Sequence, residues 1–314
     1  MVCGLALAAI ISVVAVVVAG STPTRFPPGG RASGPPGGGS ARVGHSALVP
    51  PGMPYAEAPT PSGTSAWQPS SLPPNAKAIE VPILMYHYVD VRPPVRGPWA
   101  APLTVSTASF RAQMDYLTRA GYHTLTLEQI YRCMAGREQL PAKPVALTFD
   151  DGGLDNYTVA LPILRAHHFT ATFFVITAAV GKRGYMTWGD LKEMSKFGMA
   201  IDSHTVHHHF LRSLTDTSLK AELVGSRATL MAKLGLDTKF LAYPDGGSDE
   251  RVMAATEAAG YLAAVTDKPG SAGDTLYPVA AYNWPREGIS ASDGLAGLER
   301  ALGAASSARA APSA

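Results

Sequence analysis

Residues 145–152 read Val145-Ala146-Leu147-Thr148-Phe149-Asp150-Asp151-Gly152, an apolar run that ends in two adjacent carboxylates and a glycine. A short continuous apolar run is consistent with a strand that is buried on both faces of a parallel sheet. The pattern therefore predicts that Asp150 and Asp151 stand at the carboxyl end of a buried strand.

The same strand-then-helix order recurs from Ile79 onward. Apolar runs typical of strands lie at residues 83–86, 172–176, 199–201 and 240–243, with weaker ones near 263–265 and 279–281. Helical spacing marks residues 110–117, 161–167, 188 onward, 218–234 and 250–259. A repeated β-then-α order implies parallel strands with helices outside, hence a barrel or an open α/β sheet.

Two more polar segments stand where predicted strands end. One reads Asp202-Ser203-His204-Thr205-Val206-His207-His208, and the other Tyr243-Pro244-Asp245-Gly246. In (β/α) barrels, groups at the carboxyl ends of the strands meet on one rim. The three segments are therefore expected to converge.

The residue types in these segments favour a metal-dependent hydrolase site. His204, His208 and one carboxylate can bind a divalent ion such as zinc and leave a position open for water. The second carboxylate is then available to take a proton from that water. Taken alone, the carboxylates could belong to a turn and the histidines to a solvated loop. His207 and His209 are interpreted as bystanders or as supports for the ligands.

Composition restricts the partners. A formal net charge of +2 is too small to suggest a nucleic-acid partner, and we expect a monomer. Residues 2–19 form an apolar run of roughly 27 Å as a helix, which predicts a signal peptide or membrane anchor, although no Lys or Arg precedes it. We therefore expect export to the periplasm, the cell envelope or the exterior, with membrane contact only through this segment.

The chain is predicted to have four parts. Residues 1–19 are the leader, and residues 20–78 form a Pro/Gly-rich linker. Residues 20–75 hold 13 of the 26 prolines and too few apolar residues to bury a core. Residues 79–302 are the folded catalytic domain, and residues 303–314 form a flexible tail.

The motifs resemble those of the polysaccharide deacetylases with a NodB-homology domain, carbohydrate esterase family four. Residues 148–152 match the T-F-D-D-G motif and residues 204–208 match H-[S/T]-x-x-H, while residues 82–87, 121–122 and 171–174 agree with the flanking text. The resemblance covers about Ile79 to Leu302. It implies a distorted (β/α) barrel with about seven strands. It also implies metal-dependent removal of acetyl groups from N-acetylglucosamine units of a polymer, a hydrolysis of non-peptide carbon–nitrogen bonds.

By position, the resemblance makes Asp150 the general base and Asp151, His204 and His208 the ligands of a divalent metal, with zinc expected. The Asp245 backbone N–H would help to hold the oxyanion. The family's third motif usually reads R-x-P-[Y/F]-G, but here it is Ala242-Tyr243-Pro244-Asp245-Gly246. An A-Y-P-Y-G form is familiar from the branch that acts on poly-N-acetylglucosamine. The arginine that would steady the base is absent, and Arg286 is the suggested substitute.

Further departures concern the general acid and two loops. The family commonly supplies a late histidine that protonates the leaving amine, but no histidine follows His209 here. Asp150, His87 and water all remain candidates for this general acid. His209 replaces a common proline and Gly153 a common tyrosine, which we expect to tune the loops.

His87 is a candidate for lining the cleft. The aromatic side chains that could stack on sugar rings, or pack in the core instead, are Tyr86, Trp188, Tyr243 and Trp284.

Two other functions stay open at this point. The protein could be a catalytically degenerate member of the family that binds glycan without turnover. This alternative is favoured by Ala242, Asp245 and the missing late histidine. A hydrolase of other amides or esters could also use the same scaffold, because fold does not fix substrate. Peptidoglycan, poly-N-acetylglucosamine and chitin share the reacting group, so the pattern does not select the polymer.

Overall fold

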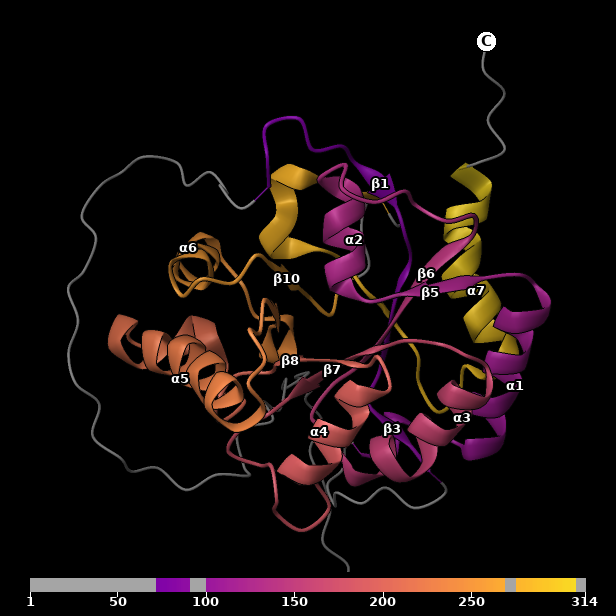
Figure 1. Ribbon diagram of the computed structural model, residues 1–314, viewed down its shortest axis with the longest axis horizontal. Helices are drawn as coiled ribbons and strands as arrows, with labels where there is room; N and C mark the ends of the chain where they lie inside the picture. Colours follow the sequence, from indigo (N-terminus) through magenta and orange to yellow (C-terminus); the bar gives the residue numbers. More distant parts are fainter. Residues whose placement is uncertain (1–71, 91–99, 269–274, 309–314) are drawn as a thin grey trace, which may run out of the picture. The chain divides into compact units, whose positions relative to one another are not determined.

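A curved parallel sheet organises the computed structural model, which describes residues 72–90, 100–268 and 275–308 (Figure 1). Seven strands are neighbours in the order β10-β9-β8-β7-β6-β2-β12, and β5 pairs with the first half of β6. Every pairing in this sheet is parallel. The strands are β2 (Ile83–Tyr86), β5 (His123–Leu125), β6 (Pro144–Phe149), β7 (Thr172–Val175), β8 (Ala200–Ser203), β9 (Phe240–Ala242), β10 (Ala263–Val265) and β12 (Glu287–Gly288). The predicted distorted barrel of about seven strands is confirmed.

Residues 284–288 connect the two ends of this sheet. Trp284 forms a parallel bridge with Val265 of β10, and its backbone exchanges hydrogen bonds with Ala264 and Thr266. Four residues later, Gly288 pairs with Met85 of β2. One short segment therefore contacts both β10 and β2, which brings its residues close to the central strands.

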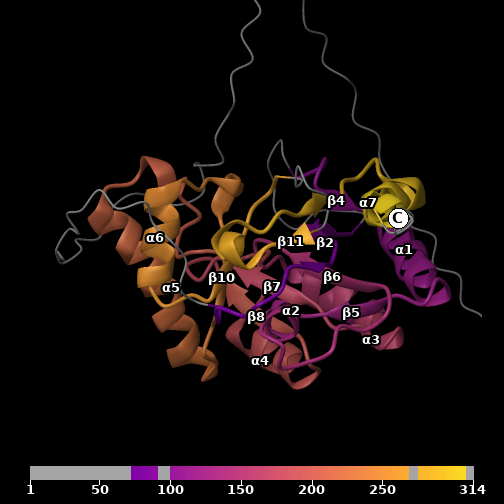
Figure 2. The ribbon, with the colours of Figure 1, turned by 90° about the horizontal axis from the view of Figure 1, so that it is seen from above.

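Helices flank the strands. They are α1 (Thr107–Arg119), α2 (Leu127–Met134), α3 (Leu161–Ala166), α4 (Trp188–Lys196), α5 (Asp216–Leu234), α6 (Glu250–Ala258) and α7 (Gly294–Ala308). Figures 1 and 2 both place α5 and α6 on one side of the strands and α1 and α7 on the other. Side-chain caps start several of them, with complete capping boxes at Thr126 and Thr187. Gly235, at a φ of 69°, ends α5 as predicted.

The central strand β6 is buried along its whole length, as its continuous apolar run predicts. Val145, Leu147 and Phe149 pack in one apolar cluster and Ala146 in another, so both faces of the strand are covered. The Phe149 ring stacks on Phe173 of β7, with 4.7 Å between ring centroids. This packing fixes the strand that ends at Asp150 and Asp151.

Several local predictions differ from the structure. The strand expected near residues 279–281 is wrong: residues Pro278–Asn283 form the 3₁₀ turn η4, in which Val279 is 73% exposed. Helices α2 and α7 and strand β5 lie outside the predicted elements. Two small sheets were also missed, β1 (Ile79–Glu80) with β11 (Thr275–Leu276) and β3 (Tyr88–Val89) with β4 (Thr104–Val105).

The predicted leader and most of the predicted linker lie outside the described residues, which all belong to one unit spanning residues 43–314. Leu72 packs against the core, and the Lys77 backbone N–H donates to Met134. At the other end α7 runs to Ala308, past the boundary expected at residue 302. Within the described ranges, none of the helices combines the length and apolarity that a bilayer crossing requires.

Candidate metal centre and active site

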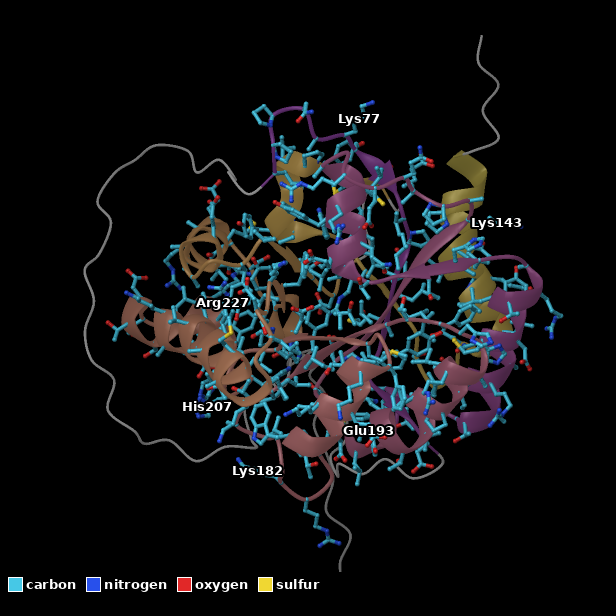
Figure 3. The ribbon with its side chains drawn as sticks, in the orientation of Figure 1. Lys77, Lys143, Lys182, Glu193, His207 and Arg227 are labelled. Carbon is cyan, nitrogen blue, oxygen red and sulfur yellow. The ribbon has the colours of Figure 1, made fainter. Side chains whose placement is uncertain are left out.

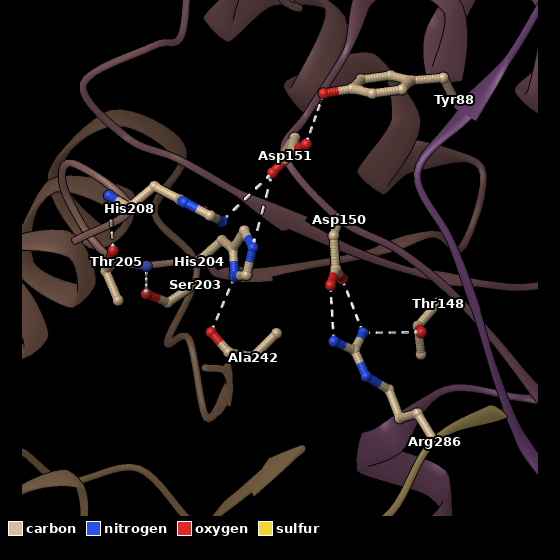
Figure 4. Close-up of polar contacts among 10 residues, drawn as sticks. All are labelled: Tyr88, Thr148, Asp150, Asp151, Ser203, His204, Thr205, His208, Ala242 and Arg286. Carbon is tan, nitrogen blue, oxygen red and sulfur yellow. Dashed lines mark hydrogen bonds and ion pairs between the residues drawn. The ribbon is translucent and has the colours of Figure 1, made fainter. Parts of the chain in front are cut away.

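The ends of β6 and β8 bring the first two polar segments together, and Ala242 at the end of β9, directly before the third segment, lies beside them (Figure 4). Asp151 Oδ1 lies 3.7 Å from His204 Nε2 and 3.7 Å from His208 Nε2. The His204 ring also reaches the strand before the third segment, where its Nδ1 lies 2.8 Å from the Ala242 carbonyl oxygen. Residues more than 50 positions apart in the chain thus share one site.

The donor atoms of this cluster fit a divalent metal. The Ala242 carbonyl can only accept, so His204 donates from Nδ1 and keeps its Nε2 lone pair directed at Asp151. Two ligands bonded to one tetrahedral zinc at about 2.1 Å stand roughly 3.4 Å apart, close to the 3.7 Å separations here. Two imidazole nitrogens and one carboxylate oxygen within 4.8 Å of one another form a donor set that zinc accepts.

Tyr88, which the sequence reasoning missed, orients the Asp151 carboxylate of the candidate metal cluster. Its hydroxyl donates to Asp151 Oδ2 at 2.6 Å, which leaves Oδ1 for the histidines. Burial, followed by the charge of Asp151, raises the pKa of Tyr88 far above its usual value, so the hydroxyl keeps its proton. A Cβ at Gly153 would stand 3.2 Å from the Tyr88 ring and 2.6 Å from Asp155 Oδ1. Glycine in place of the common tyrosine therefore leaves room for the Tyr88 side chain.

Backbone strain is concentrated at this site. Among the described residues, six non-glycine residues have a positive φ, and four of them belong to the three polar segments: Asp151, Thr205, His208 and Asp245. Such conformations cost of order 1–3 kcal/mol each and persist where surrounding contacts hold them. The contacts are visible here, since Thr205 N–H donates to Ser203 Oγ and His208 N–H to Thr205 Oγ1.

Asp150 forms a buried, two-pronged ion pair with Arg286. The guanidinium donates to both carboxylate oxygens, at 2.7 and 2.6 Å, and also to Thr148 Oγ1 and the Thr266 carbonyl. Arg286 is 1% exposed and Asp150 2%. Figure 4 shows the carboxylate directed at Arg286, with the His204 ring to one side. Arg286 therefore does reach the predicted base, from the segment just before β12.

Electrostatics keep the two carboxyls ionised and His204 neutral. Burial raises the pKa of Asp150, but the charge of Arg286, joined at low pH by that of protonated His204, outweighs it, so the net pKa lies well below the usual range. The pKa of Asp151 is also lowered, because His208, His87 and His204 outweigh its burial. Burial lowers the pKa of His204 to about 4, which leaves its imidazole uncharged near neutral pH.

The remaining predicted site residues have mixed positions. His87 is partly exposed and close enough to both carboxylates to affect their pKa values. Asp245 occupies the turn after β9, and the oxyanion role of its backbone N–H stays a prediction. The expected substrate contacts fail for Tyr243 and Trp284, whose side chains are 1% and 0% exposed and present no ring face to a sugar.

The other two aromatic candidates are also core residues to different degrees. Tyr86 is fully buried and donates to Gln113, while Trp188 is partly buried against the core at the start of α4.

A second residue that the sequence reasoning missed is Glu222 of α5, which is 3% exposed and accepts the backbone N–H groups of Val206 and His207. Glu222 thereby holds the loop between His204 and His208, the two histidines of the candidate metal cluster.

Comparisons with known proteins agree with this geometry. The family model described as polysaccharide deacetylase matches residues 137–264. The Bacillus subtilis (strain 168) protein YxkH, assigned by name to the polysaccharide deacetylases, is 33% identical over 209 residues, which cover 67% of this chain and 70% of that protein. The chain belongs to the polysaccharide deacetylase family.

Two further relatives extend the comparison. The poly-β-1,6-N-acetyl-D-glucosamine N-deacetylase of Staphylococcus aureus is 30% identical over 145 residues, 44% of this chain and 48% of that enzyme, so the match spans about half of that relative. The Streptococcus pyogenes deacetylase PplD, solved in complex with acetate, superposes with a TM-score of 0.64 at 29% identity. The superposition covers 72% of this chain and 99% of that one.

Proposed function

We propose that the protein is a metal-dependent hydrolase that removes N-acetyl groups from N-acetylglucosamine units of an extracellular or cell-wall polysaccharide. One observation carries the proposal: in a member of the deacetylase family, Asp151, His204 and His208 converge on one point beside the ion-paired Asp150. The S. aureus relative, by its name, removes the same group from a polymer of this sugar.

Asp151, His204 and His208 are the residues that would hold the divalent ion, with zinc expected, and the bound ion would supply Lewis acidity toward water and the amide carbonyl. Asp150 acts as the general base. Arg286 keeps it ionised, and each carboxylate oxygen retains a lone pair beyond the one that Arg286 occupies. Asp150 can therefore accept a proton from the attacking water.

Cleavage of the carbon–nitrogen bond leaves an amine nitrogen that needs a proton. Asp150 can return the proton that it took from water, which balances the reaction without a further group. His87, near both carboxylates, is the second candidate for this step. In either case the products are acetate and a free amino sugar.

The direct test uses the full-length purified protein with zinc and three substrates: oligomers of poly-β-1,6-N-acetylglucosamine, chitin oligomers and peptidoglycan fragments. Free amine and acetate should appear in equal amounts with at least one of them, and a chelator should abolish the release. If no metal supports release while the sugars still bind, the glycan-binding alternative is favoured. Release from acetyl esters alone would instead indicate a different hydrolase.

We also propose that the protein is exported, on the strength of the apolar run at residues 2–19 and the polymeric substrate. Fusion of residues 1–78 to alkaline phosphatase, a reporter that becomes active only after export, tests this. The fusion should be active, and the same fusion without residues 1–19 should be inactive. An inactive full fusion would contradict export.

A further inference from the structure

We propose that His207, His209 and Glu222 form a second binding site for a divalent transition metal, separate from the cluster of Asp151, His204 and His208. One ligand atom from each of the three lies within 4.8 Å of the others. The inference does not rest on the proposed deacetylase activity, because it concerns different side chains on the other side of the same loop.

The loop directs its histidines to two sides. His204 and His208 contact Asp151, whereas His207 and His209 lie beside each other, with 5.5 Å between ring centroids and 35° between ring planes. His207 contacts Glu222 of α5 through Nδ1 and Oε1, 2.7 Å apart, and Figure 3 shows His207 near α5. The left-handed backbone at His208, with a φ of 62°, separates the two directions.

The donor set suits zinc, cobalt or nickel. Two imidazoles and one carboxylate are the same ligand types as in the first cluster. Glu222 has only 3% of its surface exposed, and within the described part of the chain the sole basic side chain at ion-pair distance from it is His207. Its Oε2 accepts two backbone N–H groups, which stabilise the negative charge without neutralising it. A cation would neutralise it.

The two imidazoles are available to such an ion. Both are only partly buried, so an ion can arrive from solvent. His209 makes no hydrogen bond to the described residues, and the proton that His207 shares with Glu222 can move to Nε2, which leaves Nδ1 as a ligand. An ion held here would tie the loop of residues 204–209 to α5. This loop also carries His204 and His208.

Metal stoichiometry of the full-length protein tests the proposal. The protein is stripped with a chelator, dialysed against buffered zinc, and its bound zinc is counted per chain. We expect two equivalents for the wild type, one for His209→Gln and one for Asp151→Asn, which loses only the first cluster. His123→Gln, an exposed histidine bonded to Ala142, serves as the matched control and should keep two.

Cobalt provides a second readout that is independent of turnover. The wild type should show two successive steps in visible absorption during titration, and both His207→Gln and His209→Gln should abolish one of them. One equivalent in the wild type, or two in His209→Gln, overturns the second site. Neither result bears on whether the first cluster hydrolyses N-acetyl sugars, which the release of acetate decides.

Discussion

At the scale of single residues, the Asp150–Arg286 pair explains how this chain tolerates Ala242 in its third motif. The arginine expected four residues before Gly246 is replaced by one that comes from the segment joining β10 to β12. The pairing is two-pronged and buried, so the orientation of the base and its charge are both held. A changed third motif is therefore compatible with an oriented and ionised Asp150, the proposed base.

The roles of Asp150 and His204 separate in a pair of variants. Asp150→Asn should keep the active-site metal and lose turnover by about 10²–10⁴-fold, the usual contribution of a general base. His204→Ala should lose both, because it removes a ligand. Acetate release and bound zinc, measured on the same samples, check this. Wild-type turnover in Asp150→Asn would remove the base assignment.

Removal of the guanidinium should destabilise the fold. Arg286→Met leaves Asp150 buried and unpaired, which costs roughly 3–5 kcal/mol. Urea denaturation gives the free energy of unfolding, and the double variant Asp150→Asn with Arg286→Met is the control, since it removes the stranded charge. The double variant should be more stable than Arg286→Met alone. Equal stability of the two would contradict the claim that a stranded charge on Asp150 is what destabilises Arg286→Met.

The Tyr88 hydroxyl should matter for metal affinity. Tyr88→Phe keeps the ring but loses the 2.6 Å hydrogen bond to Asp151, and loss of such support for a ligand typically costs 10–100-fold. Competition with a chromophoric chelator measures the zinc dissociation constant. Tyr157→Phe, which loses an exposed hydrogen bond to Glu193, is the matched control and should leave affinity unchanged. An unchanged constant in Tyr88→Phe would contradict the orienting role.

At the scale of helices and strands, the regular segments follow from local patterns. Buried strands at residues 145–149, 172–176 and 240–243 and the helix ended by Gly235 were predictable, because their apolar spacing and end signals agree. Helix α2 carried a signal that was not used, the Thr126 and Gln129 spacing of a capping box. Helix α7 was hidden by Gly294, Gly297 and Gly303, which lower helix propensity.

The cap of α4 provides a test at this scale. Thr187→Ala removes the side-chain acceptor for the Asp190 N–H and should reduce the free energy of unfolding by about 1 kcal/mol. Ser195→Ala, later in the same helix, loses only a solvent-exposed hydrogen bond to the Lys192 carbonyl and should change it by less than about 0.5 kcal/mol. Chemical denaturation of both variants decides, and an equal effect of the two would mean that the capping box is not stabilising.

At the scale of the whole molecule, buried carboxyls make stability depend on pH. Burial raises the pKa of Asp202 to about 7 in the folded state, from a usual value of 3.8, although two backbone N–H groups oppose it. Between these values the folded state binds more protons than the unfolded state, so stability falls as pH rises from about 4 to about 7. The full loss is of the order of 4 kcal/mol.

Asp202→Asn should remove this dependence, because the amide does not ionise and its oxygen can still accept from Lys239 and Phe240. The free energy of unfolding, measured from pH 4 to 8 with a chelator present so that metal binding does not contribute, should fall less steeply in the variant than in the wild type. Identical slopes would show that Asp202 titrates at its usual value.

The sequence by itself determined a parallel sheet with helices outside and the four residues at the centre of the candidate site, while the distorted barrel was implied by the resemblance of its motifs to those of the polysaccharide deacetylases. Strand-then-helix alternation is local information that sets a parallel sheet, and the motifs sit at strand ends, which share one rim. Only the tertiary structure decided which distant groups complete the site. Arg286 and Asp150 are 136 positions apart, Tyr88 and Asp151 are 63 apart, and Trp284 is buried rather than open to substrate. Side-chain direction and long-range pairing depend on how the sheet curves and where residues 284–288 cross it, and no local pattern encodes either.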